Sequence, residues 1–284
     1  MIDNLSTLVE VSNFLGKRVA YIQGGGGNTS LKISRDHMLI KASGKFLSDV
    51  TIQDGFVPVD WEMLKSEICK CVTEAEYGLL LKKSIKSDDT FLRPSIETGF
   101  HAILNNCTLH SHSVWANILT CSNEGYSIVQ KLFPNAIWVP YFTPGLALTK
   151  AILERVKNQK SVTIFLQNHG IVTSNKDIKS ALDMHETITN VICKEYPMLI
   201  DFDETSDKLN TTDVKGLLFP DQAVYHSSPE LKNSRAGLET MRAYEFLLDR
   251  ITNAGLTPCY IDEAERDILV NMESEKFRQE LVDL

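Results

Sequence analysis

The sequence CTLHSHS, which runs from Cys107 to Ser113, is the segment that best predicts both the fold and the chemistry of this chain. We interpret it as a short strand, followed by a helix over 114–121. Side chains two positions apart in a strand point to the same face of a sheet, so His110 and His112 can reach one ion. The segment therefore predicts a metal site at the end of a strand.

A third ligand has to come from another part of the chain, and His169 is the strongest candidate. It follows the apolar sequence SVTIFLQ (161–167), which we interpret as a strand that ends at the tripeptide NHG. Three neutral imidazoles that leave one coordination position open form a usual catalytic zinc arrangement. The sequence thus predicts one Zn²⁺ per subunit, held by His110, His112 and His169.

Two other interpretations of these histidines stay open. An isolated HxH pair in a soluble protein is often an ordinary pair of core or surface histidines. Cys107, three residues before His110, is a further candidate ligand. Its spacing places it on a different part of the turn, which makes it a weaker candidate than His169.

Glu97 is the candidate general acid/base, because it lies close to the HxH pair and begins a helix predicted over 96–104 after Pro94. A helix-capping carboxylate is the alternative interpretation. His101 is four residues further on and shares the same helical face. We favour a packed or hydrogen-bonded histidine there over a second metal pair with Glu97.

Three polar turns have the composition of a phosphate cradle, in which hydroxyls and free backbone N–H groups bind an anion. They contain Gly24 to Ser30, Ser43 to Lys45, and Ser95. The glycine run lacks the GxGxxG spacing and the Lys-Ser/Thr of a Walker motif, so it does not indicate a nucleotide site. Three ordinary turns are the alternative.

Helical and strand patterns alternate along the rest of the chain, which indicates an α/β or α+β fold. Helices are predicted over 5–15, 62–83, 148–157, 177–195 and 237–253, and strands over 31–33, 38–41, 138–141, 171–174 and 217–225. We expect loops at Asp88-Asp89 and over 201–213. The segment 261–284 is predicted to be helical, with a solvated charged face made of Glu263, Glu265, Arg266, Glu273, Glu275, Lys276 and Arg278. His37, His185 and His226 are expected to be structural or solvated.

The bulk composition is that of a globular protein: 284 residues, 43% hydrophobic, with a net charge of −8. This charge disfavours nucleic acid and anionic membranes as partners, but a small anionic substrate remains compatible with it. No apolar run approaches the ~20 residues of a membrane span, and the N-terminus has no secretory pattern. Six cysteines without a CxxC pair indicate reduced thiols in a cytoplasmic protein.

Six segments, taken together, resemble the class II aldolase/adducin family. In family order they are GGGGNTSLK (24–32), KASGK (41–45), RPSIETGFH (93–101), LHSHS (109–113), VPYFTPG (139–145) and FLQNHGIV (165–172). The RPSIET form and FPDQAVY (219–225) are most similar to the branch that contains the aldolase part of rhamnulose-phosphate aldolase/dehydrogenases. The resemblance implies a three-layer α/β/α domain over 1–200, with a mainly helical C-terminal extension over 201–284.

The resemblance also implies roles for individual residues. His110, His112 and His169 fall on the zinc ligands and Glu97 on the acid/base, while the phosphate site falls on Gly27, Asn28, Ser43, Gly44 and Ser95. The fuculose-phosphate aldolase type has a second serine where this chain has Ile96. No tyrosine of this chain can be matched to the tyrosine acid that a neighbouring subunit supplies in some members. A homotetramer is the implied assembly.

The expected reaction is cleavage or formation of a ketose phosphate through a metal-stabilised enediolate, with Glu97 moving the proton. Retro-aldol cleavage would yield dihydroxyacetone phosphate and an aldehyde. A sugar-phosphate 4-epimerase, or a dehydratase or decarboxylase, on the same scaffold is the alternative enzyme. A non-enzymatic, adducin-like scaffold is disfavoured, because the three histidines and Glu97 are all present.

Overall fold

The structure is a computed structural model that describes residues 2–87, 92–157, 159, 161–196, 202 and 215–282. The loop predicted at Asp88-Asp89 lies outside the described residues. So does the linker predicted over 201–213, apart from Phe202, which is buried.

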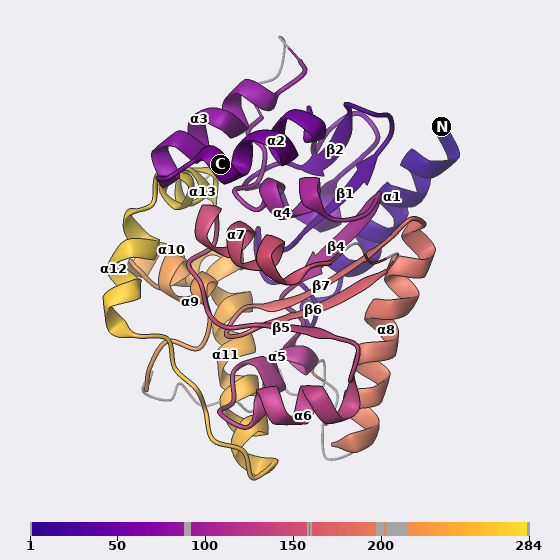
Figure 1. Ribbon diagram of the computed structural model, residues 1–284. Coiled ribbons are helices and arrows are strands. Elements are labelled where there is room, and N and C mark those ends of the chain that lie inside the picture. The colour runs from indigo at the N-terminus through magenta and orange to yellow at the C-terminus, as the bar shows by residue number, and fades with distance from the viewer. Residues whose placement is uncertain are drawn as a thin grey trace.

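Within the described part of the chain, seven strands form one mixed sheet that runs through the middle of the molecule (Figure 1). The strands are β1 (Asn28–Lys32), β2 (Met38–Lys41), β3 (Phe56–Val59), β4 (Cys107–Ser111), β5 (Ile137–Val139), β6 (Val162–Leu166) and β7 (Gly170–Asn175). Their order in the sheet is β3-β2-β1-β4-β7-β6-β5. Neighbouring strands are antiparallel except β5 and β6, which are parallel. Strand β4 is therefore central, next to β1 and β7.

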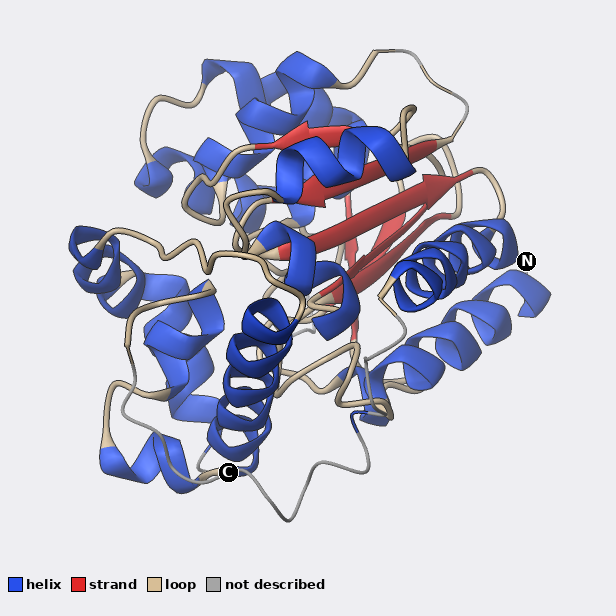
Figure 2. Ribbon diagram, turned by 90° about the horizontal axis from the view of Figure 1, so that it is seen from below, coloured by secondary structure: helices blue, strands red, loops and turns tan. Residues whose placement is uncertain are grey.

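Helices cover both faces of the sheet, as Figure 2 shows from below. The α-helices are α1 (Ile2–Gly16), α2 (Trp61–Glu67), α3 (Glu74–Ser84), α4 (Thr98–Ile103), α5 (Val114–Thr120), α6 (Gly125–Leu132), α7 (Leu146–Arg155), α8 (Ile178–Glu195), α9 (Pro220–Tyr225), α10 (Pro229–Asn233), α11 (Arg235–Asn253), α12 (Glu263–Asn271) and α13 (Glu273–Val282). Two 3₁₀ turns, η1 (Leu47–Asp49) and η2 (Ile68–Lys70), complete the described elements. Helices α1, α5 and α8 pack on one face, and α4 and α7 on the other. The predicted three-layer α/β/α fold is confirmed.

The alternation of side chains along β4 explains how this strand serves two layers. Leu109 points into the core formed with α1, α5 and α8. His110, the next residue, points to the opposite face, where its ring contacts Phe100 of α4 edge to face. The strand thus contributes an apolar side chain to one core and a histidine to the other side.

The C-terminal helices share the larger of these cores. Leu218, together with Phe246 and Leu247 of α11, packs in the same buried cluster as Leu109 and Trp115. The chain after residue 215 is thus in contact with the sheet domain. The domain boundary predicted at residue 200 stays a prediction, since it concerns whether the parts before and after it can fold independently.

Most predicted elements are present, but several differ. The strand predicted over 31–33 begins earlier, at Asn28, because residues 28–31 pair with β4. The helix predicted over 96–104 begins only at Thr98, since Pro94 forms a β-bridge with Ala42. Strand β3 and helices α6 and α10 were not predicted, and the helix predicted over 62–83 is two helices, α2 and α3, separated by η2.

The strand predicted over 217–225 is wrong. Leu217 makes a single bridge to Ile261, and Pro220 then starts α9 from its first turn. Proline suits this position, because its fixed φ matches a helix and its missing N–H is not needed there.

No helix in the described part of the chain is long and apolar enough to cross a membrane.

Candidate metal centre

Three histidines converge beside the end of β4. His110 lies in β4, His112 follows the strand directly, and His169 lies in the turn between β6 and β7. All three are buried, and their ring centroids are 4.9–5.1 Å apart. One ligand atom from each lies within 4.8 Å of those of the other two. The structure therefore brings together the three residues that the sequence predicted as ligands, in a site consistent with a divalent metal.

The turn that carries His169 depends on the two residues around it. Asn168 has φ of 54°, in the left-handed region that asparagine tolerates better than most residues. Its side-chain amide donates to the Leu218 carbonyl at 2.9 Å, which ties the turn to the C-terminal segment. A Cβ on Gly170 would lie 2.1 Å from the Ser111 carbonyl. Only glycine lets β7 begin so close to β4, which places His169 over the end of that strand.

The hydrogen bonds of the imidazoles fix which nitrogen is free to bind a metal. His110 Nδ1 donates to the Ile171 carbonyl at 3.0 Å, and His112 Nδ1 lies 2.9 Å from the carboxylate of Asp221. The Nε2 atoms of His110 and His112 face one another at 3.2 Å. When Nδ1 is the protonated nitrogen of both rings, the lone pairs of both Nε2 atoms face the same point, which is the arrangement in which two histidines bind one cation.

Burial disfavours a proton as the cation bound by these imidazoles. It lowers the pKa of His110 below its ordinary value and that of His169 to about 3, in each case by disfavouring the charged ring. Neutral imidazoles are the form that a metal binds. The donor set present in this chain therefore fits a divalent metal.

Glu97 faces the same point. It occupies the N-terminal cap position of α4 but makes no side-chain capping hydrogen bond. Its carboxylate oxygens lie 3.3 Å from His169 Nε2 and 3.5 Å from His110 Nε2. Burial raises the pKa of Glu97, whereas positive charge at the positions of His110, His169 and His112 and the hydrogen bond from Asn28 lower it. The structure thus favours the ionised, site-facing carboxylate over the helix cap.

A line of hydrogen bonds orients Glu97. The Asn28 amide donates to Glu97 at 2.7 Å, and its carbonyl oxygen accepts from His101 Nε2. The other ring nitrogen of His101 contacts the Ser30 hydroxyl at 2.7 Å. Burial lowers the pKa of His101 to about 3, so the ring is neutral and donates through Nε2. His101 is therefore the hydrogen-bonded histidine that we favoured over a second metal pair.

Ser111, between the two ligand histidines, points to the opposite face of β4. Its hydroxyl contacts His185 Nε2 of α8 at 2.6 Å. His185 is fully buried there. This histidine therefore packs behind the strand, away from the three ligand rings.

One pocket is lined by His112, His169, Glu97 and the predicted phosphate turns. The pocket is partly open to solvent. Its walls include Gly27, Asn28, Ser43, Gly44, Ser95, Ile96, Glu97, His112 and His169, as well as Lys41, Asp221, Glu275 and Arg278. The five residues predicted to bind phosphate thus share one pocket with the metal site, and their role stays a prediction.

The backbone of the glycine turn, Gly24 to Gly27, already has several hydrogen-bond partners within the protein. The N–H groups of Gly24 and Gly25 donate to Glu239 and to the Tyr225 hydroxyl. Lys41 donates to the carbonyls of Gly25 and Gly27, at 2.6 and 3.2 Å, and burial lowers its pKa to about 7. This lysine holds the turn in shape.

The family comparison agrees with this architecture. A model of the Class II Aldolase and Adducin N-terminal domain matches residues 6–194. The chain belongs to the class II aldolase/adducin family. The segment that follows residue 194 lies beyond the matched domain.

Two relatives differ in how much of their length they share with this class II aldolase/adducin chain. It is 30% identical over 177 residues to the "Uncharacterized oxidoreductase YuxG" of Bacillus subtilis, an alignment of 58% of this chain and 26% of that protein. The chain therefore spans about a quarter of that relative. It is 26% identical over 199 residues to an L-fuculose phosphate aldolase of Methanococcus maripaludis, covering 69% of this chain and 97% of the relative.

Solved structures share the fold. The N-terminal class II aldolase domain of a conserved Thermoplasma acidophilum protein has a TM-score of 0.59 and 26% identity, with 66% of this chain and 91% of that one covered. A sugar-phosphate aldolase from Thermotoga maritima has a TM-score of 0.52 at 15% identity, with 70% and 96% covered. The second likeness concerns the fold alone.

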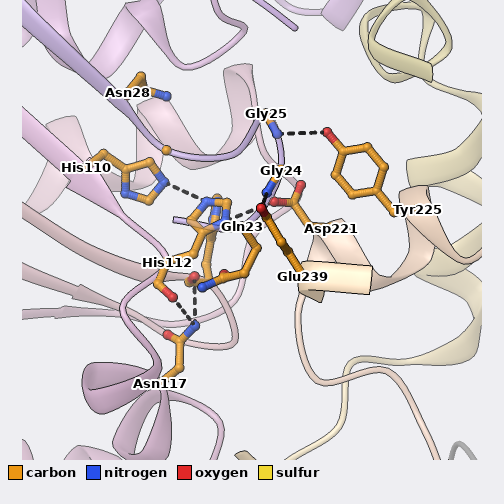
Figure 3. Close-up of polar contacts among 12 residues, drawn as sticks. Gln23, Gly24, Gly25, Asn28, His110, His112, Asn117, Asp221, Tyr225 and Glu239 are labelled. Carbon is orange, nitrogen blue, oxygen red and sulfur yellow. Dashed lines mark hydrogen bonds and ion pairs between the residues drawn. The ribbon is translucent and has the colours of Figure 1, made fainter. Parts of the chain in front are cut away.

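The C-terminal extension supplies site residues that sequence reasoning missed. Asp221 of α9 contacts His112, while Glu275 and Arg278 of α13 line the pocket (Figure 3 shows Asp221 beside His112). The prediction that Glu275 and Arg278 lie on a solvated face is wrong, because their side chains are only 4% and 14% exposed. They pair with each other at 2.8 Å. The signal that could have found Asp221 was the pair Pro220-Asp221, which is typical of the first turn of a helix. We missed it because we interpreted 217–225 as a strand.

Proposed function

We propose that this chain is a zinc-dependent aldolase that cleaves or forms a ketose phosphate. The observation that carries the proposal is the cluster of His110, His112 and His169 with Glu97, of which His112, His169 and Glu97 line one pocket. Three neutral imidazoles with an open position favour zinc among divalent metals. When bound, the metal supplies a Lewis acid that stabilises negative charge developing on substrate oxygens.

Glu97 is the group that moves the proton. Its ionised carboxylate can accept a proton from the carbon next to the substrate carbonyl and return it in the reverse direction. The Asn28 amide, 2.7 Å away, holds the carboxylate in place while it does so. The turns at Ser43-Gly44 and Ser95 border the same pocket and can hold the phosphate.

The relatives support the choice of substrate class. The aldolase from Methanococcus maripaludis aligns over nearly its whole length, which makes a sugar phosphate the best-supported substrate. The oxidoreductase name of the Bacillus relative is not transferred, since the alignment covers only 26% of it. A 4-epimerase, dehydratase or decarboxylase would use the same site and is separated from an aldolase by its products.

The assembly and location belong to the same proposal. A homotetramer follows from the family resemblance, and sedimentation velocity can test it. A cytoplasmic location follows from six free cysteines, which fluorescence microscopy of the tagged chain can test.

The direct test is to incubate the zinc-loaded protein with L-fuculose 1-phosphate and with L-rhamnulose 1-phosphate. We expect equal amounts of dihydroxyacetone phosphate and an aldehyde, detected by a coupled reduction of the former. The Glu97→Gln variant should keep its zinc but lose about 10²- to 10⁴-fold in kcat, because the proton carrier is gone. Release of no dihydroxyacetone phosphate, together with epimerisation of a pentulose phosphate, would contradict the aldolase proposal in favour of the epimerase.

A further inference from the structure

Asp221 connects the C-terminal extension to the metal centre. Its side chain is 4% exposed, with Oδ2 2.9 Å from His112 Nδ1. Among the described residues Oδ2 has no well-aligned hydrogen bond, so this ion-pair contact with the His112 ring is its polar interaction. The other oxygen, Oδ1, accepts from Arg278 at 3.0 Å. Asp221 lies outside the matched family domain, which ends at residue 194.

Local contacts place α9 so that Asp221 reaches the histidine. The backbone N–H of Leu218 donates to the Gln222 side chain at 2.8 Å, which closes the first turn around Asp221. The Leu218 carbonyl accepts from Asn168, the neighbour of the ligand His169. The extension is therefore attached to the turn that carries one ligand while it contacts another.

The glycine turn packs against the same pair. A Cβ added at Gly26 would lie 2.5 Å from Asp221 Oδ2 and 2.7 Å from His112 Nδ1. No side chain fits there without moving the carboxylate or the ring. Three segments far apart in the sequence, around Gly26, His112 and Asp221, therefore meet in direct contact.

A buried cation keeps the carboxylate charged and in place. Arg278 donates to Asp221, to Glu275 and to the Tyr225 hydroxyl. Arg278 lies 3.0 Å from the Asp221 carboxylate and is itself held by Glu275 at 2.8 Å, so a buried cation stands beside Asp221. A carboxylate beside Nδ1 can accept a hydrogen bond from it, which increases the basicity of Nε2.

We propose that Asp221 is a positioning residue of the metal centre, which holds His112 with Nδ1 protonated and Nε2 turned toward the metal. Arg278 in turn holds Asp221. The inference rests on the proposed metal site. In this way the C-terminal extension completes, from the same chain, the outer contacts of a site whose ligands lie in the family domain.

The inference can be tested by titrating the full-length, metal-free protein with Co²⁺, followed by its visible absorption and by competition with a chelator. We expect Asp221→Ala to raise the Co²⁺ dissociation constant about 10- to 100-fold and to change the absorption band, since the ring is no longer fixed. Asp221→Asn, which keeps the shape but loses the charge, should fall between Asp221→Ala and wild type. Circular dichroism checks that each variant is folded.

Glu265→Gln is the matched control, because it removes another carboxylate through which the extension contacts the family domain. Glu265 accepts from the Thr143 hydroxyl at 2.8 Å and does not touch the histidines. This variant should bind Co²⁺ much as the wild type does. Equal affinity and an identical band in wild type and both Asp221 variants would overturn the inference, as would an equal loss in Glu265→Gln. His110→Ala separates the two proposals: if neither it nor wild type binds Co²⁺, the metal site and the inference fall together.

Discussion

Asn28 shows how a residue can serve the site without touching a metal. The sequence placed it in a polar turn, with a phosphate role implied by resemblance. In the structure the side-chain amide of Asn28 lies between Glu97, which precedes α4, and His101, which lies within α4. Sequence patterns predicted Glu97 and the three histidines, because each of them lies in a short motif that can be recognised without its spatial neighbours. They could not predict Asp221, whose partner His112 is more than a hundred positions away.

Asn28→Asp tests the line of contacts behind Glu97. The new carboxylate cannot donate to Glu97 across 2.7 Å, and its repulsion should raise the pKa of Glu97. We expect a loss of about 1–3 kcal/mol in unfolding free energy and at least about a tenfold fall in kcat. Urea unfolding and steady-state kinetics measure the two effects.

Asn253→Asp, at the exposed C-terminal end of α11, is the control for the same chemical change; it should leave kcat unaltered and cost less than about 1 kcal/mol in unfolding free energy, because a negative charge there opposes the helix dipole. A variant at Asn28 that matched this control in kcat and stability would show that the amide does not orient Glu97.

Elements with a clear pattern of apolar residues were predicted well. Helices α1, α8 and α11 have regular apolar spacing, and strands β2 and β6 are continuous apolar runs, so their patterns survive without tertiary information. Short elements were harder. Helix α9 has only six residues, and all of them are buried, so it lacks the polar face that distinguishes a helix from a buried strand. Glu275 was also predicted wrongly, because it lies in a highly charged segment that suggests a solvated face, whereas its side chain is buried.

Leu247→Ala tests whether α11 and the sheet unfold together. Leu247 is fully buried in the core shared with Leu109 and Trp115. The truncation should cost about 2–5 kcal/mol and should shift one common unfolding transition, because both parts lose contacts together. Denaturant unfolding followed by circular dichroism and tryptophan fluorescence measures this shift.

Leu238→Ala, on the same helix but 59% exposed, is the matched control and should cost less than about 0.5 kcal/mol. Two separate transitions, of which only one responds to Leu247→Ala, would instead support independent folding of the parts divided at residue 200.

At the scale of the whole molecule, the sheet domain and the C-terminal helices meet at the pocket. The fold class and the central histidine triad could be predicted, since both follow from motifs inside the family domain. The route of the chain after residue 215 could not, because it depends on packing against α5 and on buried ion pairs. That packing brings Asp221 and Arg278 to a pocket whose other walls lie near the N-terminus.

The metal content of the purified protein tests the central claim most directly, measured by mass spectrometry in wild type and in His110→Ala. We predict about one zinc per chain in wild type and its loss in the variant, because two imidazoles in the remaining site leave zinc short of a ligand. Wild-type protein without bound metal, and with no uptake when zinc is added, would contradict the metal site and favour a scaffold that keeps the histidines without using them.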